Sequence, residues 1–241
     1  MKSTIKVGHY QKLAQNSGND GDDYKGLKVL ANRGLHEHVI SILSQLVPSG
    51  ASLLELGAGT GSLSLRLADQ GYAVTAVDYV EENFKATHSN IRFLQADLNK
   101  ALPAEAAGNY DAVLAVEIIE HLENTRQVVR NMAEVVKPGG RLLITTPNIC
   151  NPKSVFTFLS SGRFDLFLPR HYEKDGHINP VPWFVLHDAL LEAGMEQITI
   201  SSFKSAAWSF KGLVGSLLQF LCLGWQIPRG KILVAVASRP E

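Results

Sequence analysis

A glycine-rich turn carries the clearest chemical signal in this sequence. Gly57, Gly59 and Gly61 lie in "ELGAGTGS", between an apolar run and an amphipathic one. Glycines where a strand turns into a helix let a ligand approach the backbone closely, which is typical of nucleotide binding. Dinucleotide sites need the spacing G-x-G-x-x-G, whereas this turn reads G-x-G-x-G with Ser62 next. The spacing favours a nucleotide-like ligand without requiring a pyrophosphate.

Three acidic residues near this turn indicate which ligand it would hold. Glu55 stands two positions before the first glycine, where its charge would repel a pyrophosphate but attract an ammonium group. Asp78 ends the next predicted strand, where a carboxylate can accept from both hydroxyls of a ribose. Asp97 ends the third predicted strand, placed to accept from an exocyclic amine. Carboxylates for an amine, a ribose and an adenine together predict S-adenosylmethionine.

The segments that must position these residues alternate from residue 51 onward. Short β-branched or leucine-rich runs are separated by longer amphipathic stretches, which is typical of βαβ units around a parallel sheet. The predicted strands cover residues 52–56, 73–78, 91–96, 111–116, 140–146, 196–201 and 231–237. The sequence therefore predicts an α/β fold with a doubly wound, mostly parallel, seven-stranded sheet, whose last strand is antiparallel and lies next to the sixth.

Three regions flank or interrupt this alternation within a single predicted domain, 1–241. Residues 1–50 form a predicted N-terminal helical cap on the sheet. Residues 147–182 make an unusually long connection, and we expect this loop to contact the substrate. Residues 203–229 are predicted to form an apolar helical insertion.

Composition narrows the class of partner. Lys plus Arg and Asp plus Glu number 23 each, so the chain has no net positive charge that would attract polyanions. We therefore expect a small substrate and no nucleic acid. The two cysteines, Cys150 and Cys222, form no metal or redox spacing. The polar N-terminal stretch lacks the apolar segment of a secretory signal. A cytoplasmic protein is the resulting expectation.

Five successive motifs resemble those of class I S-adenosylmethionine-dependent methyltransferases over residues 30–202. They are "ELGAGTG", "VDY", "QAD", "YDAVLAVEIIEHL" and "VKPGGRLLITTPN". A later stretch, "DGHINPVPWFVLHDALLEAGMEQITI", is similar to ubiquinone-biosynthesis-type small-molecule O-methyltransferases. The resemblance implies a Rossmann-like methyltransferase fold and methyl transfer to a small-molecule or lipid-like acceptor, at oxygen. An NAD-linked reductase and a cofactor-binding regulatory module without turnover stay open as alternatives.

The resemblance also implies cofactor contacts by position. Glu55 and the glycines would line the methionine moiety, Asp78 would bind the ribose, and Asp97 with its successor would hold the adenine. Tyr79 would lie against the adenine ring. The full predicted set of cofactor-binding residues is Glu55, Gly57, Ala58, Gly59, Gly61, Asp78, Tyr79, Asp97, Leu98 and Glu117.

Histidines supply the candidate chemistry beyond the cofactor. His121 follows the fourth predicted strand, at the sheet edge where ligands bind in open α/β folds. Because histidine titrates near neutrality, His121 is the candidate general base for a hydroxyl acceptor, with a buried, loop-fixing histidine as the alternative. His171 and His177 are candidate substrate contacts. The acidic and histidine residues of "RHYEKDGH" lack a recognised ligand spacing, so we expect a solvated loop and no metal site.

Residues 208–227 hold the apolar centre of the expected insertion. This stretch is too short to span a bilayer, which takes about 20 apolar residues. Three roles remain open for it besides packing on the core: an apolar lid that closes over the active site, peripheral contact with a membrane, or a homodimer interface.

Overall fold

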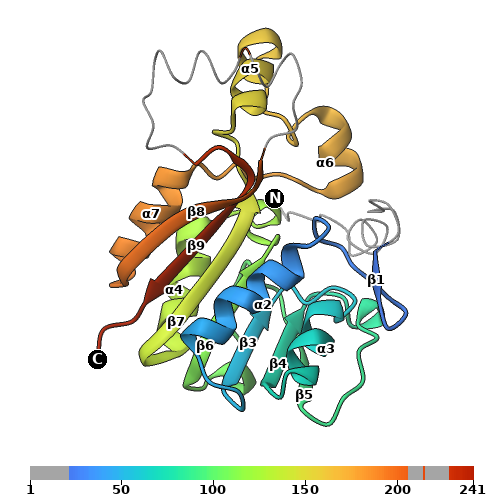
Figure 1. The fold of residues 1–241 in the computed structure, drawn as a ribbon, viewed down its shortest axis with the longest axis vertical. Helices are drawn as coiled ribbons and strands as arrows, with labels where there is room; N and C mark the ends of the chain where they lie inside the picture. The colour runs from blue at the N-terminus through green and yellow to red at the C-terminus, as the bar shows by residue number, and fades with distance from the viewer. Residues whose placement is uncertain (1–21, 206–213, 215–227) are drawn as a thin grey trace.

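A seven-stranded sheet forms the centre of the molecule (Figure 1), seen in a computed structural model that describes residues 22–205, 214 and 228–241. Its strands run in the order β5-β4-β3-β6-β7-β9-β8. All pair in parallel except β9, which is antiparallel to both β7 and β8. The strands are β3 (Ser52–Leu56), β4 (Ala73–Asp78), β5 (Ile91–Gln95), β6 (Tyr110–Val116), β7 (Val136–Pro147), β8 (Glu196–Ser205) and β9 (Gly230–Ser238). The predicted sheet, including the position of its antiparallel strand, is confirmed.

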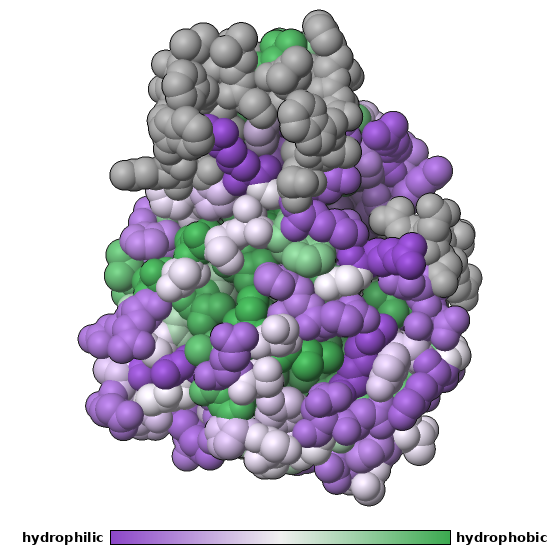
Figure 2. All heavy atoms as spheres, viewed as in Figure 1, coloured by the Kyte–Doolittle hydropathy of each residue, from purple (hydrophilic) through white to green (hydrophobic). Residues whose placement is uncertain are grey.

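Helices cover both faces of this sheet (Figure 1). On one face lie α2 (Leu35–Leu46) and α3 (Ser62–Asp69), and on the other lie α4 (Thr125–Val135) and α7 (Trp183–Glu192). Side chains alternate along each strand, so Leu53 packs in the α2–α3 core and Leu54 in the α4–α7 core. Figure 2 shows the first face, where hydrophobic side chains gather near α2 and hydrophilic ones surround them.

Local signals set where α4 begins and ends. The Asn124 side chain accepts a hydrogen bond from the Gln127 backbone amide at 3.0 Å, which caps the first turn. Val128 and Met132 are buried from this helix as their spacing predicts. The apolar pattern continues into Val136, but this residue already belongs to β7, so the strand begins earlier than the sequence predicted.

The connection over residues 147–182 is not an irregular loop. It contains α5 (Pro152–Ser161) and α6 (Pro169–Asp175). Asn151 accepts a hydrogen bond from the Ser154 amide at 3.0 Å, and proline begins both helices, where its missing amide is not needed. The stretch expected to be a solvated loop therefore forms α6, because these start signals outweigh its polar composition.

The two outer segments are only partly described. A short hairpin of β1 (Asp23–Tyr24) and β2 (Leu27–Lys28) precedes α2, within the region predicted as a helical cap. Residues 1–21, 206–213 and 215–227 lie outside the described residues, and so does most of the predicted insertion 203–229. Its first three residues belong to β8. Among the described residues no helix has the length and apolar character to cross a membrane.

Candidate active site

A cavity of about 990 Å³ opens at the carboxyl ends of β3, β4 and β6, with α6 and the residues after it forming part of its wall. Every predicted cofactor-binding residue except Gly61 lines it. His121, His171 and His177 line it too, so the structure brings the predicted substrate and catalytic histidines to the same cavity. Two three-residue helices lie near its edge, η1 (Glu81–Asn83) and η3 (Ile119–His121). A third, η2 (Ala104–Ala106), does not line the cavity.

The glycine turn after β3 is fixed by hydrogen bonds to β4. The amides of Gly57 and Ala58 donate to the Val77 carbonyl at 2.8 and 3.1 Å. The Gly59 amide donates to the Asp78 carboxylate at 2.7 Å. At Gly57, φ is +77° and a Cβ would lie 2.5 Å from the Ile118 side chain, so only glycine fits. The turn therefore has one well-defined shape.

Gly61 has a different role from the other glycines of the motif. It precedes α3 with φ +82°, and a Cβ there would lie 2.5 Å from Ala86 and 2.7 Å from Phe84. These neighbours belong to the segment after η1 and not to the wall of the cavity. The structure thus supports packing at Gly61 and gives no support to the predicted ligand contact.

Both predicted nucleoside carboxylates are oriented by their own loops. Asp78 accepts from the Val80 amide at 3.0 Å in addition to the Gly59 amide. Asp97 accepts from the Asn99 amide at 3.0 Å, and its other oxygen lies 3.3 Å from the Lys100 ammonium. A carboxylate has about four lone-pair sites, so each retains acceptor capacity at the cavity.

Glu55 is a buried acid beside the glycine turn. Its side chain accepts a hydrogen bond from the Ser64 hydroxyl, and the residue is 3% exposed. Burial, with a smaller contribution from the Asp78 charge, raises the pKa of Glu55 to about 8, although the Ser64 hydrogen bond opposes the shift. The negative charge expected from the sequence is therefore largely absent at neutral pH until a cation arrives.

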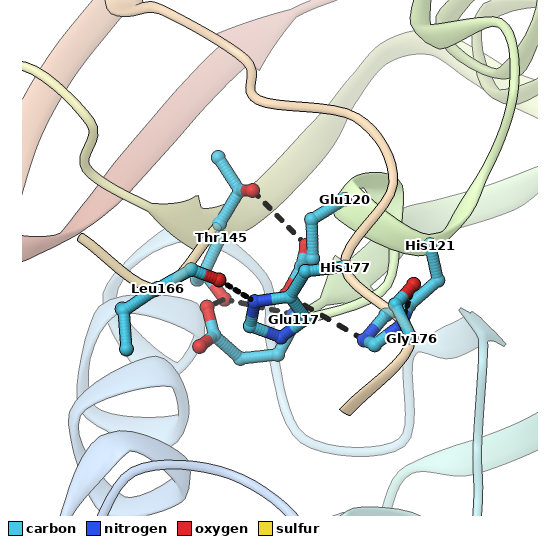
Figure 3. A network of polar contacts seen from close by, with 8 residues as sticks. Glu117, Glu120, His121, Thr145, Leu166, Gly176 and His177 are labelled. Carbon is cyan, nitrogen blue, oxygen red and sulfur yellow. Dashed lines mark hydrogen bonds and ion pairs between the residues drawn. The ribbon is translucent and has the colours of Figure 1, made fainter. Parts of the chain in front are cut away.

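Two further acids, the half-buried Glu117 and the buried Glu120, follow the end of β6 (Figure 3). Glu117 has a left-handed backbone with φ +52°, and its carboxyl accepts from the Thr145 hydroxyl at 3.1 Å and from Asn32. Burial raises the pKa of Glu117 to about 7. Glu120 is 1% exposed and accepts from the Thr146 hydroxyl at 3.0 Å. Burial and then the neighbouring Glu117 charge hold the pKa of Glu120 well above its ordinary value.

Backbone carbonyls fix the tautomers of His121 and His177. His121 Nδ1 lies 3.2 Å from the Gly176 carbonyl, and His177 Nδ1 lies 2.8 Å from the Leu166 carbonyl. Because a carbonyl oxygen only accepts, each Nδ1 carries the hydrogen and each Nε2 keeps a lone pair. His121 Nε2 is 3.9 Å from a Glu120 carboxyl oxygen. The ring centroids of His121 and His177 are 5.0 Å apart.

The pKa values of His121, His171 and His177 are all lowered from the ordinary value. Burial, and secondly the neighbouring His177, lowers the pKa of His121 to about 3. Burial also lowers the pKa of His177 and of His171. The expectation that His121 has an ordinary histidine pKa is wrong, because desolvation disfavours the imidazolium.

His171 projects from α6 into the same wall. It is 9% exposed, and its Nδ1 has no hydrogen-bond partner in the described part of the chain. The ring centroid lies 6.3 Å from that of His177. An unpartnered buried nitrogen is costly, which makes His171 a candidate contact for a polar group of a bound molecule.

Several residues of the cavity were assigned no role by the sequence predictions. Glu120 shares the stretch "EIIEH" with two predicted site residues, and its spacing from Glu117 was a usable signal. His36 lines the cavity from α2, and its Nδ1 finds no hydrogen-bond partner among the described residues. The segment 29–32 lines the other side of the glycine turn, and it carries no motif that identifies it.

Comparisons with known proteins agree with the motifs. A family model described as a methyltransferase domain matches residues 31–200, well over half of the chain. The ubiquinone biosynthesis O-methyltransferase of Xanthomonas axonopodis pv. citri (strain 306) is 29% identical over 194 residues, which cover 77% of this chain and 80% of that protein. The protein of the same name from Xylella fastidiosa (strain 9a5c) is 32% identical over 178 residues, which cover 70% of this chain and 71% of that protein.

Solved structures share the fold. An S-adenosylmethionine-dependent methyltransferase from Archaeoglobus fulgidus superposes with a TM-score of 0.58 at 15% identity, covering 85% of this chain and 93% of that one. At this identity the likeness shows the fold alone, and the family match carries the rest. The chain belongs to the methyltransferase domain family, and its predicted place among the class I S-adenosylmethionine-dependent methyltransferases is confirmed.

Proposed function

We propose that the chain transfers a methyl group from S-adenosylmethionine to a hydroxyl oxygen of a small, lipid-like molecule. The observation that carries the proposal is one cavity that joins a cofactor half, with Glu55 and Asp78, to a half with His121 and His177. Its volume of about 990 Å³ is at the upper end for ligand sites, which leaves room for an acceptor beside a cofactor. Relatives named O-methyltransferases support oxygen as the acceptor atom.

The cofactor half fits the charge of the methyl donor. When bound, S-adenosylmethionine supplies an electrophilic methyl group on a sulfonium. Glu55 would accept from the amine of the methionine moiety, since it is a buried acid with no basic partner in the described part of the chain. Asp78 and Asp97 would accept from ribose and adenine, and Glu117 would bound the pocket next to the transferred methyl. An NAD-linked reductase is disfavoured by the spacing of the glycine turn, which has Ser62 where a dinucleotide motif needs its third glycine.

Positioning is the main work of the acceptor half. Methyl transfer is an in-line displacement, so the enzyme must align donor and acceptor and remove the hydroxyl proton. His121 Nε2 holds a lone pair at the cavity and would accept that proton. Its low pKa means that it would hold the proton weakly, so it needs help from a neighbouring group. His171 and His177 would contact the acceptor.

An apolar surface near the cavity supports a lipid-like acceptor. On α5, Phe158 is 44% exposed and Leu159 is 66% exposed. This helix extends from the same end of the sheet as α6 (Figure 1). Exposed apolar residues at one end of a molecule are typical of contact with lipid or another chain. Peripheral membrane contact through this end and residues 208–227, which lie largely outside the described residues, is part of the proposal, with a homodimer as the alternative.

Binding and turnover assays test this function. Calorimetry should show S-adenosylhomocysteine binding and no binding of NADH. The protein should then be incubated with S-adenosylmethionine and matched pairs of phenols and anilines, each with and without a long alkyl chain. Mass spectrometry should find one added methyl group on the alkyl phenols. Methylated anilines with unmodified phenols would contradict the oxygen assignment, and cofactor binding with no methylated product would favour a regulatory module.

A further inference from the structure

Two basic side chains of α6 line the cavity without an acidic partner. Arg170 and Lys174 stand four residues apart, so they share one face of the helix. The other basic residue of the wall, Lys100, lies 3.3 Å from an Asp97 oxygen. Neither Arg170 nor Lys174 has a carboxylate at ion-pair distance in the part of the chain that the structure describes. Two positive charges at this wall are therefore left without a negative one.

The histidine between them lacks a hydrogen-bond acceptor. Arg170 Nε donates to His171 Nε2 at 3.4 Å, so the hydrogen of this ring is on Nδ1. His171 is 9% exposed, and its Nδ1 has no hydrogen-bond partner among the described residues. A buried N–H group without an acceptor is unfavourable. This wall therefore offers N–H donors and positive charge, and what it lacks is an oxygen-rich anion.

We propose that Arg170, His171 and Lys174 form a subsite for a carboxylate carried by the acceptor. The inference rests on the proposed function and specifies its substrate class: a hydroxyl acceptor that also bears an acid group. Neither the sequence motifs nor the names of the relatives assign an acid-binding subsite.

The charge of the α6 wall matches a carboxylate. Asp175 also lines the cavity, whereas Glu173 does not. The two positive charges of Arg170 and Lys174, less the negative charge of Asp175, leave one positive charge. A carboxylate would balance that charge, and a phosphate dianion would exceed it. The planar guanidinium of arginine can also bind both oxygens of a carboxylate at once.

Acids on the other walls would give the acceptor one orientation. Asp78 and Asp97 lie in the cofactor half, and Glu117 and Glu120 lie beside His121. When ionised, each of these would repel a carboxylate, so its favourable place is at α6. An acceptor bound in this way would direct its other end towards the rest of the cavity, where the methyl donor would bind.

His177 connects the α6 wall to the proposed base. Its ring centroid lies 6.3 Å from that of His171 and 5.0 Å from that of His121. Its amide donates to the His171 carbonyl at 3.4 Å, and its Nδ1 lies 2.8 Å from the Leu166 carbonyl. The residues on both sides of α6 are thus tied together, so a carboxylate held there would help to align the acceptor hydroxyl for transfer.

Matched acceptors test the subsite directly. Alkyl hydroxybenzoates should be compared with the corresponding hydroxybenzamides, which have nearly the same shape but no charge. At pH 7 we expect the KM of the acid to be about tenfold lower than that of the amide, with a similar kcat, and we expect added salt to reduce the difference. Equal KM values, or a preference for the amide, would overturn the subsite.

Variants of the two basic residues show where the preference arises. Arg170→Gln and Lys174→Gln should each reduce the preference for the acid about tenfold, because each removes a positive charge at the carboxylate. Arg163→Gln is the matched control, since Arg163 is an exposed arginine of the same connection that does not line the cavity, and this variant should keep the preference. Binding of S-adenosylhomocysteine checks that each variant is folded. A preference that survives in both α6 variants would overturn the proposal.

Vesicles distinguish an acid on the acceptor from a lipid surface. Sedimentation with vesicles of anionic phospholipid should be the same for the unmodified chain and the two α6 variants. Weaker sedimentation of these variants, with the preference for the acid acceptor intact, would assign Arg170 and Lys174 to a membrane surface and overturn the proposal.

Calorimetry separates failure of the subsite from failure of the proposed function. The alkyl hydroxybenzoate should bind the complex with S-adenosylhomocysteine, and Arg170→Gln should weaken this binding about tenfold. Such binding without methyl transfer to any hydroxyl would keep the subsite and reject the proposed function. Methyl transfer to acid and amide alike, with no effect of the variants, would keep the proposed function and reject the subsite.

Discussion

The cavity joins two halves that hold their functional groups by different means. In the cofactor half, the backbone amides of Gly57 and Gly59 are fixed by β4 and its terminal Asp78. In the acceptor half, the ring of His121 is held by the carbonyl of Gly176, 55 positions away, and that of His177 by the carbonyl of Leu166, 11 positions away. The first half is local in sequence and depends on backbone shape, whereas the second depends on tertiary contacts between segments.

Breaking the backbone of the cofactor half should give the largest effect. Gly57→Ala adds a Cβ that overlaps Ile118 and strains a residue with φ +77°, so unfolding free energy should fall by roughly 3–5 kcal/mol. Gly50 has φ +84° and open space where a Cβ would lie, with no atom within 4 Å, so Gly50→Ala should cost only about 1 kcal/mol. Urea unfolding measures both, and equal costs would show that the Ile118 contact is unimportant.

Glu55 should link the stability of the cofactor half to pH. Its pKa is about 8 in the folded protein and near 4.5 when unfolded, so the folded state binds the proton more tightly. Stability from the protonated acid is fully present below about pH 4.5 and is lost as pH rises through about 8. Glu55→Gln should therefore match the parent at pH 5 and be more stable by roughly 2–4 kcal/mol at pH 8.

The same Glu55 variant should bind S-adenosylhomocysteine more weakly, because the amide cannot supply a negative charge to the amine. Thermal unfolding from pH 5 to pH 8 and calorimetry at pH 7 provide the two readouts. A stability difference that stays constant with pH would contradict the raised pKa. Unchanged ligand affinity would contradict the amine contact.

A change in the acceptor half should separate turnover from binding. His121→Gln should lower the methyl-transfer rate by roughly 10²-fold, because it removes the proposed base, with little change in S-adenosylhomocysteine affinity. Steady-state kinetics and calorimetry measure the two effects. Loss of stability with turnover intact would instead support the alternative of a loop-fixing histidine bound to Gly176.

The smallest of these effects belongs to the ribose contact. Asp78→Ala should weaken S-adenosylhomocysteine binding by about 2 kcal/mol, from lost hydrogen bonds to a charged acceptor. Part of this loss would come from the Gly59 amide, which also donates to Asp78. Asp78→Asn keeps one oxygen for that amide and should lose less. Full affinity in a folded Asp78→Ala protein would contradict the ribose assignment.

Sequence patterns predicted the residues and the shape of the cofactor half, whereas in the acceptor half they predicted the histidines but not the contacts that hold them. The glycine turn, Asp78 and Asp97 each lie at or just after the carboxyl end of a parallel strand. Their positions after the predicted strands were therefore enough to predict that they meet at one edge of the sheet. Gly61 shares the motif but packs against Phe84, a contact that the motif does not encode.

The acceptor half could not be predicted in the same way. The polar composition of α6 hid its helical character, and burial lowered the pKa of His121. Burial depends on what surrounds a side chain and not on its type, so neither effect can be read from the residues themselves. The meeting of His177 with Glu120 depends on a fold-back of the chain after α6. Such contacts between distant segments leave no periodic pattern in the sequence.

The central claim is tested most directly by measuring methyl transfer in the unmodified chain and in one variant from each half of the cavity. The protein should be given S-adenosylmethionine labelled on its methyl group and an alkyl phenol, and the product should be analysed by mass spectrometry. We predict labelled methyl ether with the unmodified chain, a reduced rate with His121→Gln, and reduced cofactor affinity with Asp78→Ala. Label that appears on nitrogen, or a rate that neither variant changes, would contradict O-methyl transfer in this cavity.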